Sequence, residues 1–183
     1  MSLDIEKKYR LQPDQLESVR DELTKLGAEF AGRDFEENTI FSGENLRKTA
    51  AIIRIRKTER RVILTFKRRV PSEFDVKTQV EHEVDVSDAN AATAILAELG
   101  LSPWLLYEKH RETWRFRSVE IVFDELPFGL FMEIEGTVSE IREAEMLLGI
   151  EKLEVENETY PALTARLGNK KGEVIEARFN STK

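Results

Sequence analysis

Ionisable side chains recur at every second position in several segments of this sequence. Arg54 and Arg56 form one basic pair of this kind, and Glu133 and Glu135 form an acidic one. Two arginines at this spacing can bind phosphate oxygens through bidentate hydrogen bonds, whereas two carboxylates can share a hard divalent ion such as Mg²⁺ or Mn²⁺. Phosphoryl chemistry uses both, because cations offset the negative charge while a metal ion orients the attacking oxygen. The pairs therefore predict a site that binds phosphate and metal.

The same alternation predicts the strands that position these pairs, because alternate residues of a β-strand share one face. We expect strands at residues 3–11, 51–57, 61–68, 77–86, 107–117, 119–124 and 130–135. Each strand would carry charged or polar residues on one face and apolar residues on the other. The residues expected on the charged faces are Asp4, Glu6, Lys8, Arg54, Arg56, Thr65, Lys67, Glu81, Glu83, Asp85, Lys109, Arg111, Arg115, Asp124, Glu133 and Glu135.

Amphipathic helices are expected between the strands, where apolar residues recur at the helical period. They cover approximately residues 13–26, 88–99, 140–148 and 161–167. In the second helix, Ser87 or Asp88 would cap the first turn, and Ile95 and Leu99 would belong to the apolar face. In the third, Ser139 would be the cap. Since these helices need an apolar surface to cover, and the apolar faces of the strands supply one, the chain is predicted to be α+β.

The charged faces of the strands would then point together, and two arrangements satisfy the alternation. An open sheet with one solvated face fits it, and so does a closed barrel with a wet interior. The residue types favour the barrel, because basic residues dominate some strands and carboxylates dominate others. Such segregation suits an anion on one side of an enclosed space and cations on the other.

Length and composition set broader limits. The chain has 183 residues, enough for one domain with a real core. It is 40% hydrophobic and 34% charged, with a net charge of −7, which argues against a nucleic-acid partner. No apolar run reaches the roughly 18 residues that a membrane-spanning helix needs, and the first residues lack the features of a signal peptide. We therefore expect a cytoplasmic protein without a membrane partner, ending in a polar, loosely held tail at residues 169–183.

Six charged segments occur in a defined order along the chain. They are residues 4–8 (DIEKK), 53–56 (IRIR), 64–67 (LTFK), the pair Glu81 and Glu83, residues 109–111 (KHR), and Asp124 followed by 131–136 (FMEIEG). In type and order they resemble the CYTH family, also called the triphosphate tunnel metalloenzymes, whose first strand has the form ExExK. The likeness runs from Asp4 to about Leu167. It departs from the family at Asp4, which replaces a glutamate, and at Gln79, where many members carry an arginine.

The resemblance implies a closed eight-stranded antiparallel β-barrel, a tunnel with helices packed outside, formed by residues 1–168. A triphosphate would lie inside it. The residues implied to contact phosphate oxygens are Lys8, Arg54, Arg56, Lys67, Lys109 and Arg111. Those implied to hold one or two Mg²⁺ or Mn²⁺ ions are Asp4, Glu6, Asp124, Glu133 and Glu135. Glu81 and Glu83 would help to position metal or water.

The activity implied is that of a metal-dependent triphosphatase. Its substrate would be tripolyphosphate, a nucleoside triphosphate or thiamine triphosphate. The alternative is a class IV adenylyl cyclase, which converts ATP to cyclic AMP and pyrophosphate and shares the same metal and phosphate sites. A third hypothesis is a non-catalytic module that binds polyphosphate or nucleotides, although it gains nothing from so many acidic residues. A homodimer through an outer face of the barrel is conceivable.

Overall fold

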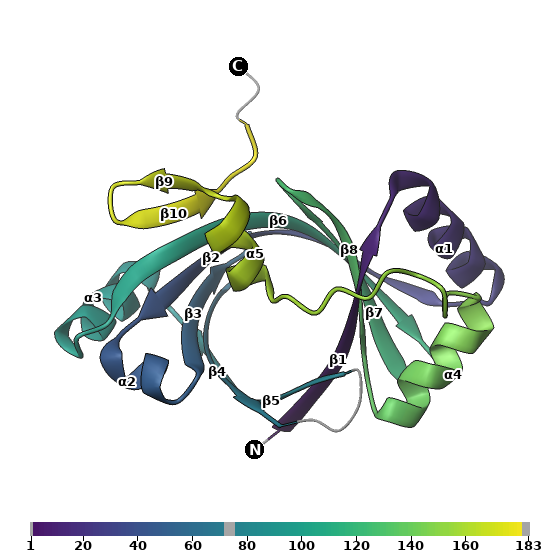
Figure 1. Ribbon diagram of the computed structural model, residues 1–183, viewed down its shortest axis with the longest axis horizontal. Helices are drawn as coiled ribbons and strands as arrows, with labels where there is room; N and C mark the ends of the chain where they lie inside the picture. Colours follow the sequence, from purple (N-terminus) through teal and green to yellow (C-terminus); the bar gives the residue numbers. More distant parts are fainter. Residues whose placement is uncertain (1, 72–75, 181–183) are drawn as a thin grey trace.

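The computed structural model of the protein describes residues 2–71 and 76–180, without the side chains of residues 2–4. Its main feature is a strongly curved sheet (Figure 1). The strands of its curved part are β1 (Ser2–Leu11), β2 (Glu29–Ser42), β3 (Ala51–Lys57), β4 (Val62–Val70), β5 (Lys77–Val86), β6 (Ser102–Phe116), β7 (Val119–Leu126) and β8 (Gly129–Glu135).

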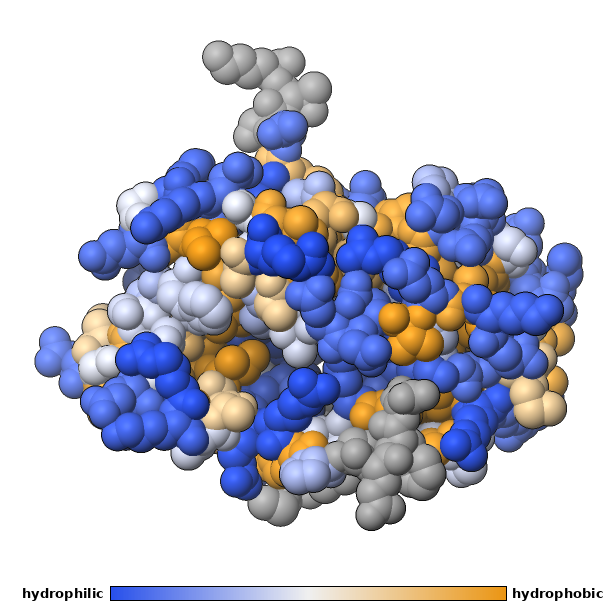
Figure 2. All heavy atoms as spheres, viewed as in Figure 1, coloured by the Kyte–Doolittle hydropathy of each residue, from blue (hydrophilic) through white to orange (hydrophobic). Residues whose placement is uncertain are grey.

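These strands follow one another around a ring. In the described residues the order is β2-β3-β4-β5-β1-β8-β7-β6, and β6 pairs in turn with β2. Every pairing within this ring is antiparallel. The ring is visible in Figure 1, whereas the space-filling view in the same direction shows side chains filling much of the space inside it (Figure 2).

Helices cover the outside of the ring (Figure 1). Helices α1 (Pro13–Lys25) and α4 (Val138–Leu148) pack on the apolar faces of β1, β6, β7 and β8, where Leu23, Ile121 and Ile134 are completely buried. On the other side, α3 (Ala89–Glu98) packs Leu96 against Phe41 and Ile55. The short helix α2 (Glu44–Lys48) precedes β3. The outward faces of the strands are therefore the apolar ones, and the charged faces point inward.

A fifth helix, α5 (Tyr160–Leu167), packs on β6 and is followed by two short strands. These are β9 (Asn169–Lys171) and β10 (Val174–Ala177), and β10 pairs in parallel with β6. The prediction of a loosely held tail is therefore wrong for residues 169–180. Arg178 adds ion pairs from the tail to Glu37 and Glu108, at 2.8 and 2.6 Å.

The prediction missed β2 entirely. This strand contains Glu36, Glu37 and Asn38 in succession, which hides the alternation, and its pairing with β6 shifts register between Phe30 and Gly32. The bulge lets the strand bend while it pairs on both edges.

Two helix details also differ from prediction. In α3, Ala92 and Leu96 are buried, whereas Ile95 and Leu99 are 62% and 70% exposed, so the predicted face is wrong. In α4, Thr137 rather than Ser139 is the cap, and Glu140 completes a capping box with it. Asp88 caps α3 as predicted. Among the described residues, none of the helices has the length and apolar character needed to cross a bilayer.

Candidate active site

A cavity of about 450 Å³ lies inside the ring, and most of its wall is charged. The residues predicted for the site that line it are Glu6, Lys8, Arg54, Arg56, Lys67, Glu81, Glu83, Lys109, Arg111, Glu133 and Glu135. Asp124 is not part of this wall, and the side chain of Asp4 lies outside the described residues. Two residues expected on the charged faces do not point inward. Arg115 and Asp85 have side chains that are 64% and 68% exposed.

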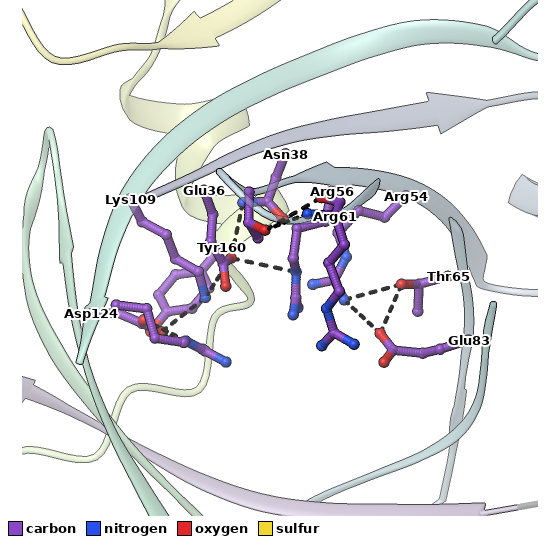
Figure 3. A network of polar contacts seen from close by, with 12 residues as sticks. Glu36, Asn38, Arg54, Arg56, Arg61, Thr65, Glu83, Lys109, Asp124 and Tyr160 are labelled. Atoms are coloured by element: carbon purple, nitrogen blue, oxygen red, sulfur yellow. Dashed lines mark hydrogen bonds and ion pairs between the residues drawn. The ribbon is translucent and has the colours of Figure 1, made fainter. Parts of the chain in front are cut away.

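Asp124 on β7 anchors the basic residues of β6. Its carboxylate accepts two hydrogen bonds from Arg111, at 2.8 and 2.6 Å, and one from Lys109 at 3.1 Å. A fourth comes from the hydroxyl of Tyr160 at 2.9 Å (Figure 3). Burial would raise the pKa of Asp124, but Arg111 and Lys109 outweigh burial and hold that pKa well below its ordinary value. Asp124 is therefore a permanent anion whose oxygens are already occupied.

Glu133 on β8 lies closer to the cavity. It pairs with Lys8 of β1 at 3.1 Å and accepts a hydrogen bond from Arg111 at 3.0 Å. Burial opposes its ionisation, but the neighbouring Lys8 ammonium lowers the pKa of Glu133 to about 2. Arg111 thus bridges Glu133 and Asp124, which fixes its guanidinium at the cavity wall.

Glu36 is a site residue that sequence reasoning missed, because it lies on the unpredicted strand β2. It is 3% exposed and pairs with Lys109 at 3.3 Å and Arg56 at 3.4 Å. Burial is outweighed by Lys109 and Arg111, and the pKa of Glu36 falls to about 2. Burial and the nearby Arg111 charge lower the pKa of Lys109 to about 8. A deeply buried Lys109 is therefore kept in place by two carboxylates, Glu36 and Asp124.

The opposite wall, from β3, β4 and β5, carries a second network (Figure 3). Arg54 donates to the hydroxyl of Thr65 at 3.2 Å and to Glu83 at 3.3 Å, and Thr65 donates to Glu83 at 2.9 Å. Lys67 pairs with Glu81 at 2.8 Å. Within the described part of the chain, the buried Nε atoms of Arg54 and Arg56 have no hydrogen-bond partner, although that of Arg56 has the ion pair with Glu36. Unsatisfied buried donors are rare, and these two are suited to an anion in the cavity.

The acidic side of the cavity lies where β1 and β8 meet. Their register places Glu6 opposite Glu135 and Lys8 opposite Glu133. Burial and the Glu133 carboxylate raise the pKa of Glu6. A further positive charge would reduce the repulsion between these two carboxylates. Glu6, Glu133 and Glu135 provide the oxygen donors that Mg²⁺ and Mn²⁺ prefer. Considering only the described residues, no group of three or more His, Cys, Asp or Glu side chains is assembled as a metal cluster. The donor set fits a metal ion in type, and Glu133 also contacts the Lys8 ammonium and the Arg111 guanidinium.

Tyr160 lines the cavity, and Lys77 lies behind its wall, 4.0 Å from the Glu6 carboxylate; sequence reasoning placed neither at the site. Tyr160 comes from α5, outside every charged strand, and no alternation could have revealed it. Lys77 begins β5 on the face of Glu81 and could have been found by extending that strand's pattern two positions past Gln79. Burial and the neighbouring Lys8 lower the pKa of Lys77 to about 8. His82 and His110 lie outside the cavity wall and contact Phe66 and Phe35, respectively.

The chain belongs to the CYTH domain family, whose model matches residues 2–164. Members of this family are triphosphatases or adenylyl cyclases, and the family is metal-dependent. The match extends from the first strand of the ring into α5, so it includes all the elements that form the cavity wall.

Particular relatives agree with this assignment. A protein of Methanocaldococcus jannaschii, named as a candidate adenylate cyclase, is 29% identical over 147 residues, which are 79% of this chain and 83% of that protein. The solved structure of the PH1819 protein of Pyrococcus horikoshii superposes with a TM-score of 0.73 at 26% identity, covering 89% of this chain and 98% of the other.

A third relative is an adenylyl cyclase homologue from Hippeastrum that is described as having a dominant triphosphatase activity. It has a TM-score of 0.70 and 18% identity, covering 89% of this chain and 95% of that one. At this identity the likeness concerns the fold.

Proposed function

We propose that this protein is a metal-dependent enzyme that hydrolyses a triphosphate held in a closed barrel, the tunnel formed by the ring of strands. The observation that carries the proposal is the buried Nε atom of Arg54 on the cavity wall, which has no hydrogen-bond partner among the described residues. Beside it, the Nε atom of Arg56 also lacks a hydrogen bond and has an ion pair with Glu36 at 3.4 Å. Leaving such donors unsatisfied costs free energy in the folded protein. A phosphate chain provides the acceptors that they lack.

The substrate would lie among the basic residues of both walls. In this proposal the residues that contact phosphate oxygens are Lys8, Arg54, Arg56, Lys67, Lys109 and Arg111. Their fixed positions support transition-state stabilisation, because the ion pairs behind them hold the charges in place before the reaction begins. The leaving phosphates gain negative charge as the bond to the terminal phosphorus breaks, and the neighbouring cations offset it.

The acidic residues would hold the metal. We assign this role to Glu6, Glu133 and Glu135, with Asp4 as a further ligand from the start of β1. Mg²⁺ or Mn²⁺, when bound, supplies a Lewis acid that polarises phosphoryl oxygens and lowers the pKa of a water ligand. Glu81 and Glu83 orient groups on the opposite wall, where they already fix Lys67 and Arg54. The predicted metal role of Asp124 does not form part of this proposal, since its oxygens are occupied by Arg111, Lys109 and Tyr160.

The test is product identification with purified protein. Tripolyphosphate, ATP and thiamine triphosphate are each incubated with Mg²⁺ or Mn²⁺, and every product is identified. Orthophosphate release that depends on the metal is the expected result. Glu112→Gln serves as a matched control, because Glu112 lies on the outer side of β6 and contacts Arg20 and Trp114 there. If no substrate yields phosphate while tripolyphosphate still binds, the protein is a binding module and the hydrolase proposal is wrong.

A second candidate function is favoured by the Methanocaldococcus jannaschii relative, which is named for adenylate cyclase activity. In that reaction the ribose 3′-oxygen attacks the α-phosphorus of ATP, a P–O bond to the β-phosphate breaks, and pyrophosphate leaves. The same cations would stabilise the departing pyrophosphate. Cyclic AMP with pyrophosphate among the products of ATP would therefore establish the cyclase in place of the triphosphatase.

A further inference from the structure

Tyr160, the first residue of α5, contacts three charged groups of the cavity at once. It is 6% exposed, and its hydroxyl donates a hydrogen bond to Asp124 at 2.9 Å (Figure 3). The ammonium nitrogen of Lys8 lies 3.5 Å from the centre of its ring, and that of Lys109 lies 5.2 Å away. A single side chain from outside the ring of strands therefore joins an anion to two cations within it.

The segment that delivers Tyr160 is itself attached to β1. Residues 154–160 cross the ring between α4 and α5 (Figure 1). The backbone of Arg10 donates to Glu154 at 2.9 Å, and that of Glu156 donates to Lys8 at 2.9 Å. The carbonyl oxygen of Glu158 then accepts a hydrogen bond from the Lys8 ammonium at 3.4 Å. These contacts fix the start of α5 relative to Lys8.

The Lys8 ammonium is consequently held from three directions. Glu133 pairs with it at 3.1 Å, the Glu158 carbonyl accepts one of its protons, and the Tyr160 ring covers another side. A lysine side chain has a flexible four-carbon stem and is normally mobile, so its charge must be restrained if it is to meet a ligand in one place. A desolvated cation over an aromatic face gains more from the contact than an exposed one.

The hydroxyl has a separate task. Asp124 accepts bonds from Arg111 and Lys109 on the same side of the cavity, and the Tyr160 hydroxyl occupies one further position on the Oδ2 atom. Without that donor, the carboxylate would draw the Lys109 ammonium more strongly to itself and away from the cavity. The ring thus orients Lys8, and the hydroxyl sets how firmly Asp124 holds Lys109.

We propose that Tyr160 is a positioning residue for anion binding: its ring fixes the Lys8 ammonium, and its hydroxyl orients Asp124 and through it Lys109. This inference rests on the proposed function, because it assigns Lys8 and Lys109 to the phosphate chain. It also gives a reason for the position of α5, which comes after β8 and α4 in the chain and yet returns to the cavity.

Two substitutions separate the role of the Tyr160 ring from that of its hydroxyl. Tyr160→Phe keeps the ring and removes the hydroxyl, whereas Tyr160→Leu removes both. We expect the dissociation constant of tripolyphosphate, measured by calorimetry, to rise about threefold in the phenylalanine variant and about tenfold or more in the leucine variant. Equal losses in both variants would contradict the role of the ring.

Tyr9→Phe is the matched control. Tyr9 is also a buried tyrosine on the wall of the ring, and its hydroxyl donates to the Glu145 carboxylate at 2.7 Å, but it faces the outer core. Tyr9→Phe should lower the melting temperature at least as much as Tyr160→Phe and leave the dissociation constant unchanged. Weaker tripolyphosphate binding by Tyr9→Phe would show that general loosening, not positioning, explains the effect.

A double-mutant cycle tests whether the ring acts through Lys8. In a Lys8→Met background, Tyr160→Leu should raise the dissociation constant of tripolyphosphate by a smaller factor than it does in the wild type. The double variant should therefore bind more tightly than the product of the two separate effects predicts. Full additivity would overturn the proposal, because it would show that the ring and the ammonium contribute independently.

A measurement without ligand keeps the two proposals apart. Ring currents of Tyr160 should shift the ε-proton resonances of Lys8 upfield in the free protein, and Tyr160→Leu should abolish that shift while Tyr160→Phe retains it. An unshifted Lys8 resonance in the wild type would overturn the positioning role whatever the enzyme does. Conversely, a shifted resonance in a protein that binds no tripolyphosphate would contradict the proposed function and, with it, the assignment of the ring's effect to anion binding.

Discussion

Arg111 and Glu112 are neighbours on β6 and face opposite sides of the ring wall. Outside, Glu112 accepts hydrogen bonds from Arg20, Arg33 and Trp114 at 2.7 to 3.2 Å. Inside, Arg111 donates to Asp124 and Glu133 at similar distances. Both clusters satisfy their central residue, so ion-pair geometry alone does not distinguish a structural cluster from a functional one.

The surroundings make the difference. Outside, the Glu112 cluster is complete and borders solvent, since the Arg33 side chain is 68% exposed. Inside, a cavity lies against the charges, and the Nε atoms of Arg54 and Arg56 make no hydrogen bond to the described residues. Burial, together with repulsion by Glu133, raises the pKa of Glu6. Donors without hydrogen bonds and carboxyl groups with a raised pKa, when they border a cavity, indicate a binding site. Charges that are fully paired and border solvent indicate a structural contact. Substitutions on the two sides of the wall test this distinction.

The largest effect is expected from replacing carboxylates on the inner side. The double substitution Glu133→Gln and Glu135→Gln removes two proposed metal ligands and should lower metal-dependent phosphate release by at least on the order of 100-fold. Phosphate release is measured over a range of Mg²⁺ concentrations, with the melting temperature as a check on folding. Turnover that survives this change in a folded protein would show that the metal site lies elsewhere.

The next effect concerns the basic pair of β3. Arg54→Ala and Arg56→Ala each remove a bidentate donor from the cavity wall, so kcat/KM for tripolyphosphate should fall by about 10- to 100-fold, mainly through a higher KM. Arg115→Ala is the control, because Arg115 pairs with Glu29 on the outside at 3.4 Å. Similar losses in all three variants would mean that net charge, and not the inner position, governs binding.

Glu112→Gln tests the outer cluster through stability. The substitution keeps the shape and removes the charge that Arg20 and Arg33 share, so it should lower the free energy of unfolding by about 2 kcal/mol and leave activity unchanged. Chemical denaturation at neutral pH measures the first quantity. A loss of activity with intact stability would place Glu112 in the functional network.

The pH dependence of this stabilisation has a definite sign. Burial alone would raise the pKa of Glu112, but hydrogen bonds from Trp114, Arg20 and Arg33 outweigh it and lower the pKa below its ordinary 4.5. A carboxylate with a lowered folded-state pKa stabilises the protein above the unfolded-state pKa, and this stabilisation disappears as the pH falls through the folded-state value. The difference between wild type and Glu112→Gln should therefore be full above about pH 5 and shrink below about pH 4. A constant difference across this range would contradict the lowered pKa.

The sequence predicted the inner wall well wherever charges alternate with apolar residues. Arg54, Glu83 and Lys109 were placed on inward faces because their strands are regular, and a period of two leaves no choice once one face is buried. Basic and acidic strands are neighbours in the ring, as the ion pair between Arg54 and Glu83 shows, so each wall carries charges of both signs.

The rest of the site required tertiary information. Glu36 lies in a run of polar residues on a bulged strand, so its inward direction follows from pairing with β6 and not from local pattern. Tyr160 enters the cavity from a helix whose docking depends on contacts with β6 and β10. Asp124 was predicted at the site, but its hydrogen bonds with Arg111 and Lys109 were not, because they depend on the pairing of β6 with β7.

The smallest predicted effect lies at the mouth of the cavity, where four arginines of the turn between β3 and β4 and of β4 divide into two kinds. All four are exposed, but Arg61 and Arg69 line the cavity, whereas Arg60 and Arg68 do not. Each Arg→Ala change removes one positive charge, so the net charge of the variants is identical and only position differs.

We expect Arg61→Ala and Arg69→Ala to lower kcat/KM for tripolyphosphate by about two- to threefold at low salt, because charges at the mouth of an enclosed site raise the local concentration of an anion. Arg60→Ala and Arg68→Ala should change it by less. At about 0.5 M NaCl the Debye length is shorter than the distance over which such charges act, so the difference between the two pairs should vanish. A difference that persists at high salt would instead indicate direct contact with the substrate, and would move Arg61 and Arg69 from the mouth into the binding site itself.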